Sequence, residues 1–190
     1  MLLLNNDVEA LQPGWLEAMA AQALRPCVGA VGAVLLYPDS NIQHAGVQLG
    51  FGRLRNSAEH AYRGLPLATP VHRNRAPLRP AVTGACLMVQ RAHWGAVGGL
   101  DERLPVEFND VAFCLSLLER GLRNLVEPAA QLIHYECQSR VPENSPTAEA
   151  ALLRVNRCFP QFMQASSPWW PGSASAEHTD GRPRELADYG

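Results

Sequence analysis

Three side chains that can bind a cation or accept a proton occur where apolar segments of the sequence end. Asp7 follows one apolar run, His134 ends another, and Asp110 opens an amphipathic segment. A carboxylate oxygen and an imidazole nitrogen together suit a divalent cation such as Mn²⁺ or Mg²⁺. Such a cation can neutralise a diphosphate leaving group, and a positioned carboxylate can take a proton from a hydroxyl. The three positions are therefore candidates for chemistry on a diphosphate.

Each of these residues also has a purely structural interpretation. Asp7 can end a strand through an Asx-turn, and Asp110 can interact with the positive end of its helix. His134 at a strand end can be a hydrogen-bonded structural residue. For a lone residue the structural interpretation is the more common one, so the functional interpretation depends on the elements that carry all three.

Hydrophobic runs predict an alternation of strands and helices along the chain. Residues 28–36 are rich in valine and lie between Pro26 and Pro38, which is typical of a buried strand. Further strands are expected at 2–4, 47–51, 81–90, 124–126 and 131–135, and helices at 13–24, 91–97, 110–121 and 148–162. This alternation favours an α/β fold, in which ligands gather beyond the carboxyl ends of the strands. Segment 5–7 follows a strand in this position.

The segment 110–121 is the clearest of the expected helices. Asn109 or Asp110 can cap its start, and Gly121 can end it. Its apolar face is formed by Val111, Cys114, Leu115 and Leu118. Asp110 is therefore expected in the first helical turn.

Two other stretches lack a regular period. Residues 52–80 hold four prolines and six arginines, so a long loop is expected there. The arginines are Arg53, Arg55, Arg63, Arg73, Arg75 and Arg79. They could contact an anionic or lipid-linked acceptor, and an ordinary solvated loop is the alternative. Residues 166–190 are expected to form a flexible tail that follows a single domain at 1–165.

The composition of the chain excludes several classes of protein. Its 190 residues suffice for one domain with a core, and 16 basic against 18 acidic residues give no reason to expect a nucleic-acid partner. Five scattered cysteines suggest neither a disulfide framework nor a zinc ribbon. No apolar run reaches the roughly 18 residues of a membrane span, and no export signal is recognised. We expect a cytoplasmic protein, free or peripheral at the inner face of the membrane.

Several segments resemble the family-2 glycosyltransferases of the GT-A type, and a bacterial rhamnosyltransferase-like branch in particular. The segments are LLNNDVE at 3–9, IQHAGV at 42–47, HAYRG at 60–64, AVTGACLMV at 81–89, VGGLDE at 97–102, VEFNDV at 106–111 and LIHYE at 132–136. They are similar, in this order, to the DxD-type metal motif, the middle of the branch, the acceptor-side strand and turn, the base helix and the closing histidine segment. Several separate motifs in one order are stronger evidence than a single short pattern.

The resemblance implies a Rossmann-like GT-A (nucleotide-diphospho-sugar transferase) fold, with a mixed sheet flanked by helices. It implies an enzyme of polysaccharide biosynthesis that moves a sugar, with inversion, from a nucleotide-diphospho-sugar donor to a glycan or lipid-linked acceptor. Asp7 and His134 would hold Mg²⁺ or Mn²⁺, and Asp110 would be the general base. Contacts to the donor diphosphate would come from Asn5, Asn6 and Arg140, and contacts to the acceptor from Thr83, Gly84, Ala85, Glu107 and Asn109.

The chain departs from the family pattern at its start and in the base helix. It begins only about three residues before the DxD-type motif, so we expect a fold truncated at its N-terminus and completed by an upstream polypeptide. Ala112 and Ser116 stand where the family commonly has aspartate and arginine. A non-catalytic remnant or carbohydrate-binding module of the same fold is the alternative. A nucleotidyltransferase is a weaker third, since it would need a glycine-rich basic loop before the metal site.

Overall fold

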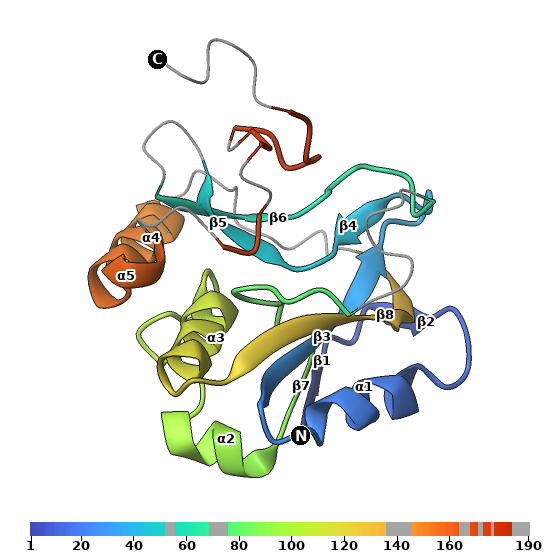
Figure 1. Cartoon of the computed structure of the whole chain (residues 1–190), viewed down its shortest axis with the longest axis horizontal. Coiled ribbons are helices and arrows are strands. Elements are labelled where there is room, and N and C mark those ends of the chain that lie inside the picture. The colour runs from blue at the N-terminus through green and yellow to red at the C-terminus, as the bar shows by residue number, and fades with distance from the viewer. Residues whose placement is uncertain are drawn as a thin grey trace.

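The computed structural model (Figure 1) describes most of the chain. The described residues are 1–51, 56–68, 76–135, 146–163, 168–170, 173–175 and 177–183. Arg140, expected at the donor diphosphate, lies outside these residues, as do four arginines of the expected loop at 52–80, namely Arg53, Arg55, Arg73 and Arg75.

A mixed sheet of six strands forms the centre of the molecule. Its strands are β1 (Leu2–Leu4), β2 (Val8–Ala10), β3 (Val28–Leu36), β4 (Ile42–His44), β7 (Cys86–Val89) and β8 (Arg123–His134). The order is β1-β7-β3-β8-β2, and β4 pairs with β3. Only β3 and β8 run parallel, and the other pairs are antiparallel. The expected α/β fold with a mixed sheet is confirmed.

Helices cover both faces of this sheet. Helix α1 (Trp15–Ala23) packs on one face, where Met19 and Ala23 meet Val31 and Leu35 of β3. The other face is covered by α3 (Asn109–Glu119). The buried residues of α3 form one hydrophobic core with Ala30 and Val34 of β3. Every residue of β3 is buried because both of its faces are covered (Figure 1), as the valine-rich run at 28–36 predicts.

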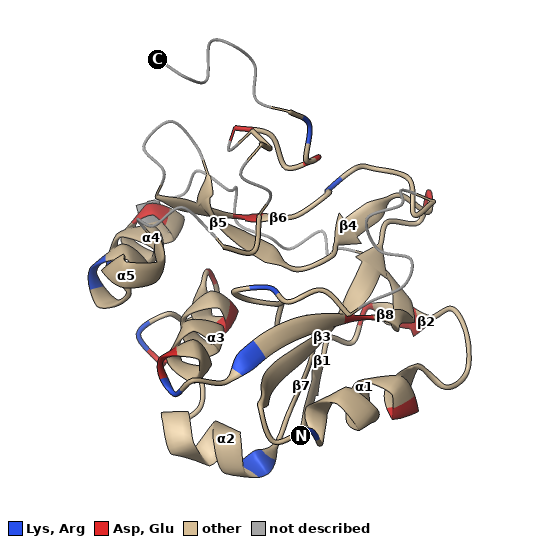
Figure 2. Ribbon diagram, viewed as in Figure 1, with Lys and Arg blue, Asp and Glu red and all other residues tan. Residues whose placement is uncertain are grey.

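A smaller second layer lies beyond α3. It consists of a two-stranded sheet of β5 (Val47–Phe51) and β6 (Ser57–His60) and of helices α4 (Pro146–Cys158) and α5 (Pro160–Met163). Helix α2 (Arg91–Val97) packs beside α3 at the end of the main sheet. Acidic and basic side chains are interspersed over these elements (Figure 2), so the ribbon shows no face of one charge among the described residues.

Most of the expected elements are confirmed, and four expectations about them are wrong. The strand expected at 81–90 is limited to β7, and the two strands expected at 124–126 and 131–135 form one strand, β8. Between the residues paired with Ala33 and Val34, three residues of β8 including Pro128 are inserted, and a bulge accommodates the missing proline N–H. The helix expected at 148–162 is divided into α4 and α5.

The fourth error concerns the loop expected at 52–80, which contains β6. Residues Ser57–His60 pair with β5, and the described part of the following segment returns to the main sheet. The expected flexible tail is also partly described: Trp170 is 9% exposed and stacks near Phe51 and Tyr62. The tail makes a second contact, since the backbone N–H of Tyr62 donates to the carbonyl oxygen of Thr179 over 2.6 Å. The boundary at residue 165 stays a prediction.

In the described ranges, no helix combines the length and apolar character that crossing a bilayer requires.

We expect Gly32→Ala to destabilise the fold by about 1 to 3 kcal/mol, the usual cost of overpacking. Gly32 lies in β3, and a Cβ built on it would be 2.6 Å from Cβ of Val82. Urea unfolding measures the loss. The control is Gly95→Ala in α2, where an added Cβ meets nothing within 4 Å and alanine should raise the free energy of unfolding slightly. Equal stability of the two variants would contradict this view of β3.

Candidate functional site

Strand pairing brings Asp7 and His134 together. Asp7 lies in the turn between β1 and β2, and Val8 of β2 pairs with His134 at the end of β8. The backbone N–H of Tyr135 donates to the carbonyl oxygen of Asp7 over 3.0 Å. In consequence, Oδ1 of Asp7 lies 3.3 Å from Nε2 of His134. Two candidate ligands 127 positions apart in the sequence therefore face each other.

The chemistry of this pair fits a divalent cation. Oδ1 of Asp7 is buried and has no hydrogen-bond partner, so a lone pair there is unused. Two neighbouring ligands on an octahedral Mg²⁺ lie about 3.0 Å apart, close to the spacing found here. Within the described residues no group of three or more histidine, cysteine, aspartate and glutamate side chains could hold a metal. The pair thus suits a cation that completes its shell with water or substrate oxygens.

The two asparagines of the same turn are placed differently. Nδ2 of Asn5 lies 3.3 Å from Nε2 of His134, so this side chain borders the candidate cation position. Asn6 is exposed. The position of Arg140 is outside the described residues.

Asp110 is held at the start of α3 by two backbone N–H groups. Gly84 N donates to Oδ2 over 2.8 Å, and Val111 N donates to Oδ1 over 2.8 Å. Phe108, directly before the helix, has a φ of 61°, which is unusual for a bulky residue and turns the chain sharply into α3. The carboxylate is half-buried and keeps lone pairs that the two N–H groups do not use.

The expected acceptor-side residues connect Asp110 to the cation pair. Asn5 N donates to the carbonyl oxygen of Ala85 over 2.9 Å, and Ala85 N donates to Oγ1 of Thr83 over 3.3 Å. Gly84, between them, holds Asp110. Glu107 and Asn109 are half-buried and adjoin Asp110 along the chain. The segment Thr83–Ala85 therefore bonds through Ala85 to Asn5, in the turn that carries Asp7, and through Gly84 to Asp110.

The hydrogen bonds of this segment explain why β7 is shorter than the expected strand. The N–H groups of residues 82, 83 and 84 donate to the side chains of Cys114, His44 and Asp110. A backbone whose donors go to side chains cannot continue a strand ladder. The segment before β7 is irregular because it serves the site.

Two site residues were missed as such in the sequence analysis, Gln43 and His44 of β4. Segment 42–47 stands out in the sequence only through its resemblance, which gives these two residues no role. His44 is fully buried, and its Nε2 accepts from Thr83 N over 3.3 Å. Burial, followed by the charges of His60, Arg79 and His134, holds the pKa of His44 well below its usual value. The neutral ring can therefore act as the acceptor that Thr83 needs. The sequence does carry a signal for these two residues, because a polar amide and an imidazole are unusual in a short buried strand.

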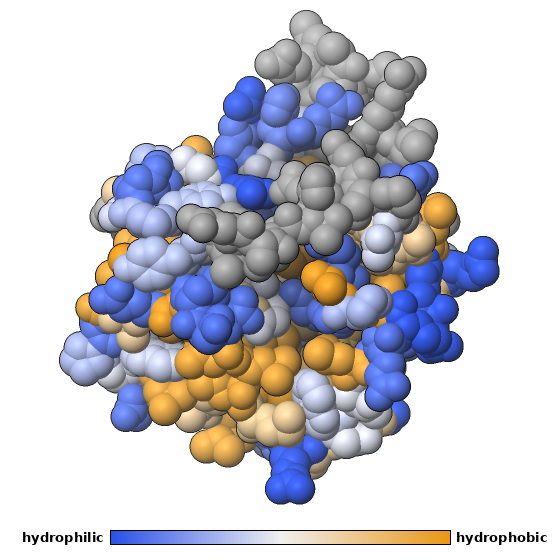
Figure 3. All heavy atoms as spheres, turned by 180° about the vertical axis from the view of Figure 1, so that it is seen from behind, coloured by the Kyte–Doolittle hydropathy of each residue, from blue (hydrophilic) through white to orange (hydrophobic). Residues whose placement is uncertain are grey.

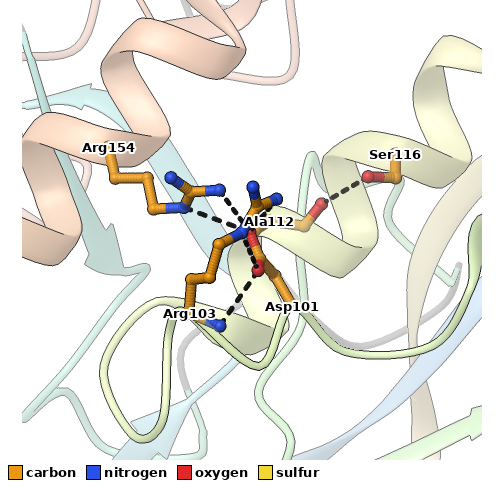
Figure 4. A network of polar contacts seen from close by, with 5 residues as sticks. All are labelled: Asp101, Arg103, Ala112, Ser116 and Arg154. Carbon is orange, nitrogen blue, oxygen red and sulfur yellow. Dashed lines mark hydrogen bonds and ion pairs between the residues drawn. The ribbon is translucent and has the colours of Figure 1, made fainter.

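A pocket of about 500 Å³ lies on another side of α3. It is lined by the turn after α2, by Ala112, Phe113 and Ser116 of α3, and by the end of α4. Ser116 donates its hydroxyl to the Ala112 carbonyl over 3.0 Å (Figure 4). The two positions that depart from the family pattern are small side chains that face this hollow.

Asp101 ties the pocket wall to α4. It accepts from Arg103 at 2.8 Å and from Arg154 of α4 at 3.0 Å (Figure 4). The hydrogen bonds of Arg103, joined by that of Arg154, lower the pKa of Asp101 to about 2. The Asp101–Arg154 ion pair joins the loop after α2 to helix α4, which is distant in the sequence.

Asp101→Asn is expected to lower the free energy of unfolding at neutral pH by about 1 kcal/mol or less, because solvent screens this exposed network. The folded pKa is depressed from 3.8, so the contribution is present above pH 3.8 and is lost as the pH falls toward about 2. Thermal unfolding of both proteins at several pH values measures it. The difference between them should narrow between about pH 4 and pH 2. A constant gap would contradict the ion-pair assignment.

Comparisons with known proteins show which proteins this chain is similar to. No family model matches the chain. It is 44% identical over 156 residues to the uncharacterized protein y4gI of Sinorhizobium fredii, covering 80% of the chain and 17% of that protein. It is 39% identical over 153 residues to the O-antigen biosynthesis protein RfbC of Myxococcus xanthus, covering 78% and 12%.

A third relative has a more specific name. The N-acetylglucosaminyl-diphospho-decaprenol L-rhamnosyltransferase of Mycobacterium tuberculosis is 29% identical over 151 residues, which are 73% of the chain and 48% of that enzyme. Among solved structures, GalNAc-T7 with UDP, GalNAc and Mn²⁺ superposes with a TM-score of 0.61 at 15% identity, over 86% of the chain and 33% of that protein. The chain spans less than half the length of each of these relatives.

Proposed function

We propose that this chain, which belongs to the GT-A type glycosyltransferases, forms the metal- and acceptor-binding part of an inverting, metal-assisted sugar transferase. The observation that carries this proposal is the Asp7–His134 pair, 3.3 Å apart with an unpartnered carboxylate oxygen. The segment Thr83–Ala85 bonds both to Asn5, in the same turn as Asp7, and to Asp110. A nucleotide-diphospho-sugar is the proposed donor, and a hydroxyl of a glycan or lipid-linked sugar is the proposed acceptor.

Asp7 and His134 would bind Mn²⁺ or Mg²⁺. A cation held there supplies positive charge to the departing diphosphate. Two observations support this assignment: the solved GalNAc-T7 contains Mn²⁺ and UDP, and the two candidate ligands of this chain have the spacing and the unused lone pair of a cation site. Asn5 borders the same position, and with Asn6 and Arg140 it would contact the donor phosphates.

Asp110 would take the proton from the attacking acceptor hydroxyl. A sugar hydroxyl is a poor nucleophile, so removal of its proton as the bond to the anomeric carbon forms is worth roughly two to four orders of magnitude in rate. Gly84 and Val111 fix the orientation of the carboxylate through their N–H groups. The remaining lone pairs would face the acceptor, lined by Thr83, Gly84, Ala85, Glu107 and Asn109.

An upstream polypeptide would pair with β1. Among the described strands β1 has one partner, β7, so its other edge carries free backbone groups. Met1 and Leu4 are 47% and 46% exposed, and apolar surface gathers on the reverse face of the molecule (Figure 3). An open apolar edge of this kind favours addition of a strand.

The test is release of nucleoside diphosphate from a panel of nucleotide-diphospho-sugars, with Mn²⁺ and a sugar acceptor. The chain is assayed alone and with the polypeptide encoded upstream. Transfer that depends on metal and acceptor supports the proposal. Binding of glycan without turnover in both assays would favour the non-catalytic alternative, and diphosphate release from a nucleoside triphosphate would favour a nucleotidyltransferase.

A further inference from the structure

The side-chain amide of Gln43 contacts His134 through both its nitrogen and its oxygen. Nε2 of Gln43 donates to the backbone carbonyl oxygen of His134 over 3.2 Å, and Oε1 lies 2.6 Å from Nδ1 of the same residue. Gln43 is 3% exposed and His134 is 6% exposed, so water hardly competes for these bonds. The two residues are 91 positions apart in the sequence.

This double contact determines which ring nitrogen of His134 carries the hydrogen. A carbonyl oxygen can only accept, so the NH₂ end of Gln43 must point to it and the Oε1 end must face the ring. Oε1 also only accepts, so Nδ1 of His134 must donate. In the neutral ring the lone pair then lies on Nε2, which faces Asp7 Oδ1 and Asn5 Nδ2.

We propose that Gln43 is a positioning residue of the cation site, which holds His134 in the tautomer whose Nε2 lone pair points at the Asp7 carboxylate. This inference rests on the proposed metal-binding role of His134. Two acceptors, Nε2 and Oδ1, face each other without a hydrogen between them in that tautomer. Such an arrangement is repulsive when empty and becomes favourable when a cation lies between them.

The next residue of β4 extends the same reasoning to the acceptor side. Successive side chains of a strand point to opposite faces. Gln43 holds the cation ligand His134, and His44 accepts from Thr83 N beside Gly84 and Asp110. One short strand therefore bonds to both parts of the site, and its pairing with β3 anchors it to the buried centre of the sheet.

The experiment compares three variants of the whole chain by ¹⁵N NMR of the histidine rings and by Mn²⁺ titration. Gln43→Met keeps an unbranched side chain of similar length but removes the acceptor. Gln43→Glu keeps an acceptor for Nδ1–H. The matched control is Gln48→Met in β5: Gln48 is also fully buried, and among the described residues its Nε2 donates to the carbonyl oxygen of its neighbour Leu49 at 3.3 Å.

The wild-type ring of His134 should show hydrogen on Nδ1. Gln43→Met should shift the ring toward the Nε2–H tautomer and weaken Mn²⁺ binding roughly 10- to 100-fold, the usual effect of losing such a partner. Gln43→Glu and Gln48→Met should retain the wild-type tautomer. An unchanged tautomer in Gln43→Met would overturn the inference. Wild-type protein that binds no Mn²⁺ at His134, with the tautomer still dependent on Gln43, would instead refute the proposed metal role.

Discussion

Asp110→Asn is expected to reduce sugar transfer by roughly two to four orders of magnitude, the range for loss of a positioned general base. Asparagine has nearly the same shape, and its amide oxygen can still accept from Gly84 N, which lies 2.8 Å from Oδ2 of the native residue. The amide cannot take a proton at neutral pH. The rate of the chemical step should fall while Mn²⁺ affinity stays close to that of the parent. The unfolding midpoint should drop slightly, because the amide NH₂ cannot accept from Val111 N.

The matched control for this substitution is Glu119→Gln, at the other end of α3. Glu119 is exposed and accepts from Gln161 over 2.8 Å, outside the proposed site. It should transfer sugar at the parent rate. The measurement is initial rate against acceptor concentration, with the upstream polypeptide supplied to all proteins. Undiminished transfer by Asp110→Asn would remove Asp110 from the mechanism and leave the fold assignment intact.

Asp7→Asn is expected to weaken Mn²⁺ binding by at least one to two orders of magnitude and to lower transfer in parallel. The carboxylate supplies negative charge as well as an oxygen, and Oδ1 is unpartnered only 3.3 Å from His134 Nε2. Losing a ligand should cost at least as much as losing an outer-shell partner, which costs roughly 10- to 100-fold. Paramagnetic broadening of the His134 signals by Mn²⁺ measures binding at this position directly.

The control for Asp7 is Glu9→Gln, two residues later in β2. Glu9 is exposed, and its carboxylate accepts from the Tyr135 hydroxyl over 2.6 Å, which raises the pKa of Tyr135. This variant removes the same charge from the same strand pair but should bind Mn²⁺ as the parent does. An equal loss of Mn²⁺ affinity in both variants would mean that the net negative charge of this region attracts the cation, without a specific ligand at Asp7.

Local sequence predicted several elements well. The runs at 2–4, 28–36 and 47–51 match β1, β3 and β5, because short apolar stretches bounded by polar or proline residues are typical of strands. Strands β3 and β5 are fully buried, whereas β1 is only partly buried. Helix α3 begins at Asn109, one residue before the expected start, but the expectation that Asn109 or Asp110 caps it is wrong: Phe108 is the capping position and makes no side-chain capping bond. The resemblance to a family supplied a hypothesis that periodicity could not, namely that Asp7, Asp110 and His134 belong to one site.

The sequence did not predict the elements whose reason for existing is a distant partner. Strand β2 has only three residues and is formed because Val8 pairs with His134. The segment before β7 reads as strand but is irregular, since its N–H groups donate to side chains from β4 and α3. Such donors can be identified only when the partner's position is known.

The amino-acid sequence by itself determined which segments must be buried, where α3 begins, and which three side chains could carry out the chemistry. The tertiary structure alone decided how those side chains are held. Gln43 reaches His134 only because β4 and β8 both pair with β3. Hydrophobic period is a property of neighbouring residues, whereas a hydrogen bond across 91 positions depends on strand order and register, which no local pattern encodes.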